Sequence, residues 1–366
     1  MLKLTNFKNS IMPILIVIFT VFSLNLELKI IEDRGVSQYI VAIIGFLIFL
    51  VMNVKQRLAF RIKNINILFI FIFIFILLNS IAVRGETLLG AIFILFVSVS
   101  IAKLLNYKSE KVNFKIYLFP FWMLSGYIVL ALSVDPDPNH VFIRSRNYIS
   151  FYLILTILPY YFLNFKKMNE ASIIPSIVLL ALSVYSFSRS GTAASLLIFI
   201  AALLSKNNKI RYFLSICALF LVIIFFSSLD LGVLLFRFSD LFESLESGAR
   251  STIWQNYMAN MDFYDFIFGV DLTDNKILNF GGEYIPSHAH SSILNFLSVT
   301  GVIFYLFIYY VIITSMRLYK ISWSLLLIFF AVLLRVMTES GALFGYFDYV
   351  IWMFFLIQKK DLNAFR

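Results

Sequence analysis

The sequence predicts an all-α, polytopic integral membrane protein of about twelve transmembrane helices, with both termini in the cytoplasm. The first observation is composition. The 366 residues are 61% hydrophobic, more than one soluble domain of this length can bury, so lipid is expected to be part of the solvent. The second is that apolar runs of about 16 to 22 residues recur, close to the ~20 that a helix needs to cross the hydrocarbon core. The third is the distribution of basic residues between these runs.

The apolar runs justify the predicted spans one by one. They lie at residues 11–26, 36–52, 64–83, 87–105, 116–134, 148–163, 171–187, 191–205, 210–229, 291–313, 321–338 and 342–357. The seventh and eighth runs are short, so they form either two spans or a broken pair around residues 188–191. Lys3 and Lys8 precede the first run, and no small-residue cleavage site follows it, which favours a retained first span over a signal peptide.

Charge supplies the orientation, because cytoplasmic loops are enriched in Lys and Arg. With the N-terminus inside, 20 of the 30 basic residues and only three of the 20 acidic residues (Glu110, Glu170 and Asp361) fall in cytoplasmic segments. The net charge is then +17 inside and −7 outside, which accounts for the overall +10 without nucleic acid as a partner. The single cysteine, Cys217, excludes a disulfide within the chain.

Residues 230–290 form the longest polar interruption, and the predicted alternation places them outside the cytoplasm as a large loop. Within this loop, an amphipathic helix is expected to lie flat on the outer membrane surface. Its apolar face would carry Ile253, Trp254, Tyr257, Met258 and Met261. The loop is the expected place for part of an active site, because it meets the other polar edges on the same side of the membrane.

Four of the arginines that fall in outer segments, against the charge rule, are candidates for a binding site: Arg144, Arg146, Arg189 and Arg250. Arg189 opens the eighth run in a turn framed by serine and glycine. Helix N-termini carry unsatisfied N–H groups and a partial positive charge, so this turn suits an anion. Arg250 follows Ser-Gly in the same way. Snorkelling to lipid headgroups is the alternative for each of these side chains.

Arg335 is a fifth candidate, near the outer end of the eleventh run. It either contributes to the anion site or snorkels to the headgroups. Glu339 follows four residues later, which is the spacing of an ion pair along one helix face.

The histidines His288 and His290 immediately precede the tenth run. A zinc site would need further ligands such as Asp271, Glu283 or His140, and the spacing matches no zinc motif. An interfacial pair without function is a second interpretation. The third is that an imidazole near several arginines acts as a general base or hydrogen-bonding partner for a hydroxyl nucleophile.

Three short motifs occur in a fixed order: Ser-Arg-Ser-Gly at 188–191, Ser-Gly-Ala-Arg at 247–250, and His-Ala-His at 288–290 before a Leu-rich run. Together they resemble the O-antigen polymerase and O-antigen ligase superfamily. In that family the last motif commonly reads His-X-His-Asn. Here Ser291 replaces the asparagine, and His290 matches the second histidine. Arg146 with Asn147 resembles the family's Asn-containing earlier outer loop.

The resemblance implies a GT-C-like, metal-independent glycosyltransferase of the bacterial inner membrane, with its active site on the periplasmic side and no cofactor. His290, with His288 in reserve, would act on the acceptor hydroxyl, and Arg250 would join them in catalysis. The side chains expected to bind the substrate pyrophosphate are Arg189, Arg250, Arg146 and Arg144, with Arg335 as a further candidate.

The resemblance also implies the substrates, which are undecaprenyl-pyrophosphate-linked glycans as donor and acceptor. A polysaccharide polymerase would join their repeat units in O-antigen or capsule synthesis, within the membrane lipid and with a chain-length regulator protein as a candidate partner. A ligase would transfer the glycan to lipid A core, and no residue distinguishes the two. A flippase or other transporter is the alternative that is not an enzyme, although such proteins more often carry mid-span charges and repeated halves.

Overall fold

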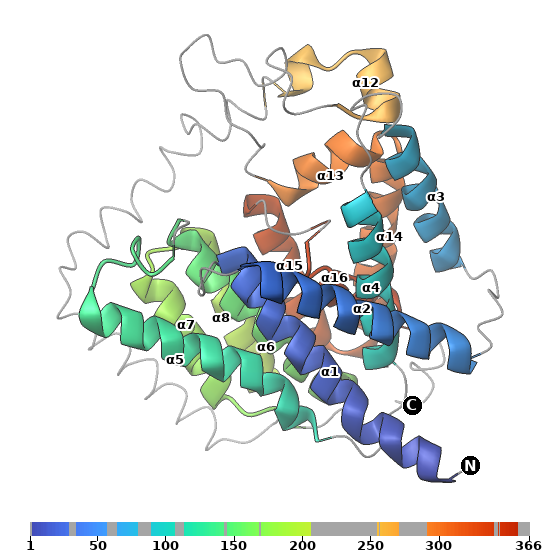
Figure 1. Ribbon diagram of the computed structural model, residues 1–366. Helices are drawn as coiled ribbons and strands as arrows, with labels where there is room; N and C mark the ends of the chain where they lie inside the picture. Colours follow the sequence, from blue (N-terminus) through green and yellow to red (C-terminus); the bar gives the residue numbers. More distant parts are fainter. Residues whose placement is uncertain are drawn as a thin grey trace.

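The computed structural model describes residues 2–28, 34–56, 64–79, 89–106, 113–142, 145–167, 170–205, 255, 257–270, 291–339, 343 and 345–357. Every regular element in these ranges is a helix (Figure 1). The helices of the first part are α1 (Leu2–Leu28), α2 (Arg34–Gln56), α3 (Asn64–Asn79), α4 (Leu89–Asn106), the 3-10 turn η2 (Phe114–Leu118), α5 (Phe119–Val134), α6 (Asn147–Lys166), α7 (Ile174–Tyr185) and α8 (Arg189–Leu204). Those of the second part are α12 (Phe263–Phe268), α13 (Ser292–Thr300), α14 (Ile303–Ile321), α15 (Trp323–Thr338) and α16 (Tyr349–Phe355).

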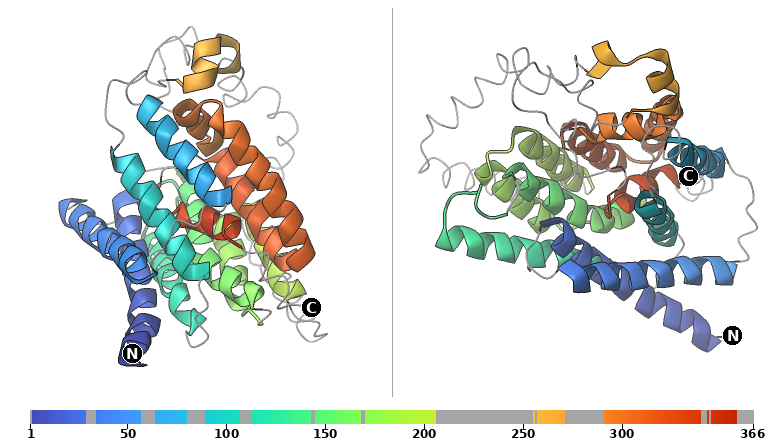
Figure 2. Two further views of the ribbon diagram at one scale, coloured as in Figure 1. Left: turned by 90° about the vertical axis from the view of Figure 1, so that its right-hand side faces the viewer. Right: turned by 45° about the horizontal axis from the view of Figure 1, so that its top comes forward.

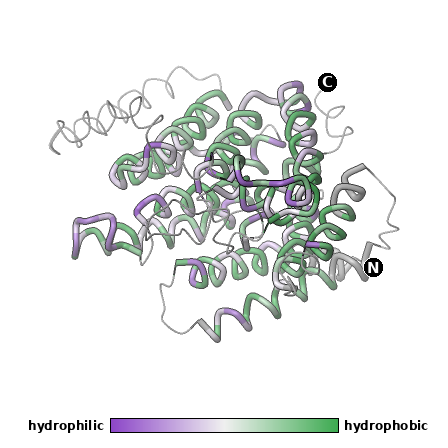
Figure 3. Tube along the Cα trace, turned by 90° about the horizontal axis from the view of Figure 1, so that it is seen from above, coloured by the Kyte–Doolittle hydropathy of each residue, from purple (hydrophilic) through white to green (hydrophobic). Residues whose placement is uncertain are grey.

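Four stretches of the described chain are helical, long and apolar enough to cross a bilayer: Ile11–Leu28, Phe114–Val134, Asn147–Lys166 and Ile303–Ile321. Further apolar helices of 10–17 residues accompany them. Hydrophobic residues dominate the described helices (Figure 3). The predicted class, an all-α membrane protein, is therefore confirmed, whereas the number of spans and the side on which the termini lie remain predictions.

Helix α6 is the centre of the bundle. It is apolar on every face, and 94% of its most hydrophobic stretch is buried inside the protein, which is typical of a helix surrounded by other helices rather than by lipid. It packs against η2, α5, α7, α8 and α15. Because α6 packs against so many helices, loops from several of them can meet at its first turn.

The first eight predicted runs each overlap a described helix, from α1 to α8. The ninth, at residues 210–229, lies outside the described residues. The seventh and eighth are two separate helices, α7 and α8, joined by a three-residue turn. Of the predicted amphipathic face in the outer loop, Tyr257 is buried and Met258 is exposed, while Ile253 and Trp254 lie outside the described residues.

The tenth run is not one continuous helix, which corrects the prediction of a span at 291–313. It bends at Gly301, where φ is +51°, and becomes α13 followed by α14. A Cβ at Gly301 would lie 2.0 Å from the carbonyl oxygen of Ile267, so α12 packs directly on the bend. Hydropathy cannot reveal a bend that depends on a backbone contact. Figure 2 shows α14 beside α3, with α12 at the end of the pair.

The twelfth run is also different from its prediction. Only Tyr349–Phe355 is helical among its described residues, and seven residues extend about 10 Å, too short to cross the hydrocarbon core alone. All seven side chains of α16 are buried, and the helix lies in the middle of the bundle against α4, α6, α14 and α15 (Figure 1). Hydropathy cannot separate a helix buried in protein from one that faces lipid.

Polar contacts join helix ends that the predicted alternation places on the same side. Lys166, at the end of α6, donates from Nζ to the backbone and side-chain oxygens of Asn106 at the end of α4. At the opposite end of α6, Arg335 of α15 contacts the starts of α6 and α8. The relative up-and-down order of these four helices therefore agrees with the prediction.

Candidate functional site

The turn before α8 has the geometry that the sequence predicts. Ser188 is the N-cap residue, its hydroxyl accepts a hydrogen bond from the backbone N–H of Gly191, and Arg189 is the first helical residue. Phe187, just before the cap, has φ of +51°, a left-handed conformation that is strained for a bulky side chain. The turn thus places Arg189 at the positive end of a helix dipole.

Gly191 brings the start of α8 against the first turn of α6. A Cβ built there would lie 2.1 Å from the hydroxyl oxygen of Ser150, a separation that no side chain tolerates. Ser150 in turn donates to the backbone oxygen of Asn147, the first residue of α6. Glycine at this position is therefore what lets the two helix N-termini touch.

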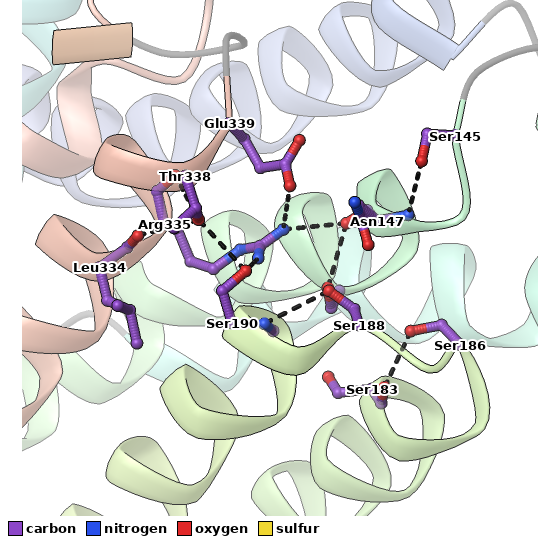
Figure 4. Close-up of polar contacts among 12 residues, drawn as sticks. Ser145, Asn147, Ser183, Ser186, Ser188, Ser190, Leu334, Arg335, Thr338 and Glu339 are labelled. Atoms are coloured by element: carbon purple, nitrogen blue, oxygen red, sulfur yellow. Dashed lines mark hydrogen bonds and ion pairs between the residues drawn. The ribbon is translucent and has the colours of Figure 1, made fainter. Parts of the chain in front are cut away.

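Arg335 ties these two N-termini to the end of α15. Its side chain is 0% exposed. One guanidinium nitrogen, Nη2, donates to the backbone oxygen of Asn147 at 2.9 Å, and the other, Nη1, donates to the hydroxyl of Ser190 (Figure 4). Thr338, one turn later, also hydrogen-bonds to Ser190, at 3.2 Å. The ring of Phe151 lies 5.6 Å from the guanidinium carbon, so the cation is enclosed.

This arrangement fits neither of the two interpretations that the sequence offers for Arg335. Snorkelling to headgroups is wrong, because the side chain is buried and points into the protein. The expected pairing with Glu339 is confirmed, since its Oε1 lies 3.7 Å from Nη2 of Arg335. A guanidinium that is buried, paired and bonded to two other helices positions its neighbours; it is not placed for direct binding of a substrate.

The start of α13 joins the same cluster through the backbone of Glu339. The backbone N–H of Ser292 donates to the carbonyl oxygen of Glu339 at 2.8 Å, and the Ser292 hydroxyl contacts the same oxygen. Ser291 caps α13 by accepting from the backbone N–H of Leu294. His290 immediately precedes Ser291 in the sequence. Helix α13, whose start follows the predicted histidine motif in the sequence, therefore begins at the end of α15, where Glu339 pairs with Arg335.

The connection from α15 to α16 contains the second strained residue. Leu343 has φ of +57°, and its backbone N–H donates to Asp348 Oδ1 at 2.7 Å. Asp348 also accepts from the backbone N–H of Gly345. In the described part of the chain, Phe187 and Leu343 are the two non-glycine residues with positive φ. Both lie in connections next to the Arg335 cluster, and such strain gathers at functional sites.

The predicted site residues divide into two groups. Arg146 and Arg189 are adjacent in sequence to Asn147 and Ser190, the two residues that Arg335 joins, so the cluster brings their backbones together. The others, Arg144, Arg250, His288 and His290, lie outside the described residues. Sequence reasoning missed the roles of Thr338 and of the Asn147 carbonyl. The sequence signal that could have identified Thr338 is its spacing of three residues from Arg335, which places both side chains on one helix face.

The loop between α5 and α6 holds a separate polar pair. Asp135 Oδ2 lies 2.7 Å from His140 Nδ1, and this hydrogen bond raises the pKa of His140 above its ordinary value. The pKa of Asp135 is lowered, first by the backbone N–H of Asp137 and then by His140. In the ranges that the structure covers, no group of three His, Cys, Asp or Glu residues is arranged to hold a metal.

The cluster has the parts of an anion site. The N-termini of α6 and α8 meet at one point, and the positive ends of both helix dipoles favour a negative ligand there. Arg335 forms an ion pair with Glu339 inside the protein. Arg146 and Arg189 are partly exposed at the starts of α6 and α8. Comparisons of the chain with protein-family models, with curated proteins and with solved structures find no match.

Proposed function

We propose that this protein is a membrane-embedded glycosyltransferase that joins undecaprenyl-pyrophosphate-linked oligosaccharide repeat units and releases undecaprenyl pyrophosphate. One observation carries the proposal. Three of the sequence segments that resemble the O-antigen polymerase family, at Arg146, Arg189 and the start of α13 after His290, are far apart in the chain and come together around Arg335 and Glu339. Random membrane packing gives no reason for these three segments to share one set of hydrogen bonds.

The anion site would bind the pyrophosphate of the donor. A lipid pyrophosphate lies at the headgroup level, where helix ends lie, and guanidinium groups bind phosphates through paired, charge-assisted hydrogen bonds. In this proposal Arg146 and Arg189 hold the diphosphate at the starts of α6 and α8. They also stabilise the negative charge that develops as the bond to the anomeric carbon breaks. Arg250 and Arg144 would complete the site from the outer loops.

His290 would act on the acceptor. An acceptor hydroxyl attacks the anomeric carbon of the donor, its proton passes to the imidazole, and the electron pair of the broken C–O bond leaves on undecaprenyl pyrophosphate. The tie between Ser292 and Glu339 supports this role, because it holds the chain that follows His290 against the cluster. His288 would be the auxiliary imidazole.

The proposed location of the reaction is the extracytoplasmic face of the bacterial inner membrane. The support is the predicted charge of +17 on one side and −7 on the other. A cysteine placed at Asn275 should react with an impermeant thiol reagent added from outside, and a cysteine at Asn208 should be spared. The opposite labelling pattern would reverse the orientation and remove the basis for a periplasmic site.

The direct test is transfer by purified protein in nanodiscs, supplied with undecaprenyl-pyrophosphate glycan extracted from the producing cells. A ladder of longer glycans, with one undecaprenyl pyrophosphate released for each addition, supports a polymerase. Product only on added lipid A core would identify a ligase. Movement of the lipid-linked glycan across the bilayer without new glycosidic bonds would identify a transporter, and the enzymatic proposal would then be wrong.

Two conservative substitutions test the role of the arginines. Arg189→Lys and Arg250→Lys keep the charge but lose the planar fork, so each should abolish polymer while membrane protein levels stay normal. Arg317→Lys is the matched control, because Arg317 is exposed on α14 away from the cluster. Wild-type polymer from either lysine variant at 189 or 250 would show that bidentate binding is not needed there.

A further inference from the structure

Helix α1 carries a polar face that the site described above does not use. Thr20, Ser23 and Glu27 follow one another at spacings of three and four, which places them on one side of the helix. The Thr20 hydroxyl is 3.0 Å from the Tyr349 hydroxyl, and the Ser23 hydroxyl is buried with no hydrogen-bond partner among the described residues. Polar groups within membrane helices are costly and usually functional.

Glu27 is the carboxylate of this face, half-buried in the last turn of α1. The hydroxyl of Tyr152 on α6 donates to its Oε2 at 3.0 Å. Tyr152 is itself 0% exposed, so it holds the carboxylate in one position. Tyr152 is five positions after Asn147, about 7.5 Å along the helix axis. Glu27 is therefore close to the level of the Arg335 cluster.

Aromatic packing connects Glu27 with the Arg335 cluster. The ring of Tyr152 lies 5.1 Å from that of Phe151, and Phe151 is the ring beneath the Arg335 guanidinium. On its other side Tyr152 packs against Phe347, with ring centres 5.4 Å apart. The first turns of α6 thus connect the two charged groups. Phe151 lies against the Arg335 guanidinium, and Tyr152 contacts the Glu27 carboxylate.

The connection between α15 and α16 is a second link between the Arg335 cluster and Glu27. It begins at Glu339, which pairs with Arg335, and it reaches Tyr346 beside Glu27. Burial raises the pKa of Tyr346, and the nearby Glu27 carboxylate raises it further. Within this connection, Asp348 accepts hydrogen bonds from the backbone N–H groups of Leu343 and Gly345.

We infer that Glu27 is an acceptor-binding residue, whose carboxylate accepts hydrogen bonds from hydroxyl groups of a sugar in the lipid-linked acceptor. Sugar hydroxyls are neutral donors and suit a fixed carboxylate, whereas a pyrophosphate is repelled by it. The arginine end of the site would thus select the diphosphate of the donor, and the Glu27 end would select the glycan that attacks it. This inference rests on the proposed glycosyltransferase function.

The test separates acceptor binding from donor binding. The donor is the natural undecaprenyl-pyrophosphate glycan, and the acceptor is the same repeat unit on a short, fluorescent prenyl pyrophosphate, each varied at saturating concentrations of the other. Glu27→Gln keeps the size of the side chain and a carbonyl oxygen for Tyr152, so the fold should be retained. A hydrogen bond to a charged group is worth about a tenfold to hundredfold change in affinity, so the acceptor KM should rise by that factor while the donor KM is unchanged.

Two further variants complete the design. Tyr152→Phe removes only the hydroxyl that holds Glu27, and it should raise the acceptor KM by a smaller factor. Glu170→Gln is the control, because Glu170 is an exposed carboxylate beyond the opposite end of α6, and it should match the wild type.

The outcomes are distinct. If the wild-type protein transfers glycan and Glu27→Gln has unchanged KM values, or if donor and acceptor KM rise equally, Glu27 does not bind the acceptor, and only this inference is overturned. A loss of kcat together with lower thermal stability and an unchanged acceptor KM assigns Glu27 a structural role and also overturns it. If the wild-type protein transfers no glycan, the proposed function fails, and the acceptor assignment falls with it.

Discussion

Removal of the Arg335 side chain should destabilise this protein more than any exposed substitution, because the guanidinium is fully enclosed and joins three helices. Arg335→Ala removes the hydrogen bonds to Asn147 and Ser190 and leaves Glu339, itself only 5% exposed, without the cation at 3.7 Å. Breaking a buried pair by removing one partner costs about 3–5 kcal/mol. Arg335→Lys keeps the charge but reaches fewer partners, so it should cost about 1.5–3 kcal/mol, the value of one hydrogen bond to a charged group.

The free energy of unfolding can be followed in mixed micelles by titration with sodium dodecyl sulfate, using tryptophan fluorescence. Arg317→Ala is the matched control, since Arg317 is exposed and its loss should change the free energy of unfolding by less than about 0.5 kcal/mol. The double variant Arg335→Ala with Glu339→Gln should be more stable than Arg335→Ala alone, because it no longer buries a carboxylate that has lost the Arg335 cation.

Two results would contradict this role of Arg335. An Arg335→Ala protein that unfolds at the same detergent fraction as the wild type would show that the buried cluster contributes nothing to stability. If the effects of Arg335→Ala and Glu339→Gln simply add, the two side chains are not coupled, and the pairing across 3.7 Å is not the cause of the loss.

Two further predictions concern the same site. Gly191→Ala should push α6 and α8 apart, cost about 1–3 kcal/mol of stability and reduce transfer, because its Cβ would lie 2.1 Å from Ser150 Oγ. Ser150→Gly in the same chain removes the two nearest atoms, so it should restore part of the lost stability and transfer, although the Ser188 hydroxyl would still lie 2.6 Å from the added Cβ. No gain at all from Ser150→Gly would contradict the close approach. His290→Ala should slow transfer by at least about a hundredfold, with a smaller effect of His288→Ala and no effect of chelators. A wild-type rate from His290→Ala would exclude it as the base, and loss of activity in EDTA would revive the zinc interpretation.

The parts of the fold that the sequence determines are those set by local properties of the chain. Hydropathy alone indicates the helices from α1 to α8, because each of them overlaps one of the long apolar runs of the sequence. The Ser188 cap and the start of α8 at Arg189 follow from the preference of serine for the N-cap and of small residues for the turn. The pairing of Glu339 with Arg335 follows from a spacing of four on one helix.

The tertiary structure decides what depends on contacts between distant segments. Nothing local distinguishes the buried α16 from a lipid-facing helix. Gly301 ends α13 with φ of +51°, a conformation that glycine adopts at helix ends, but only the tertiary structure brings the Ile267 carbonyl so close that no side chain fits there. Arg335 carries the same charge whether it faces lipid headgroups or the interior. Its partners, Asn147 and Ser190, are 188 and 145 positions away, so only packing could bring the starts of α6 and α8 to it.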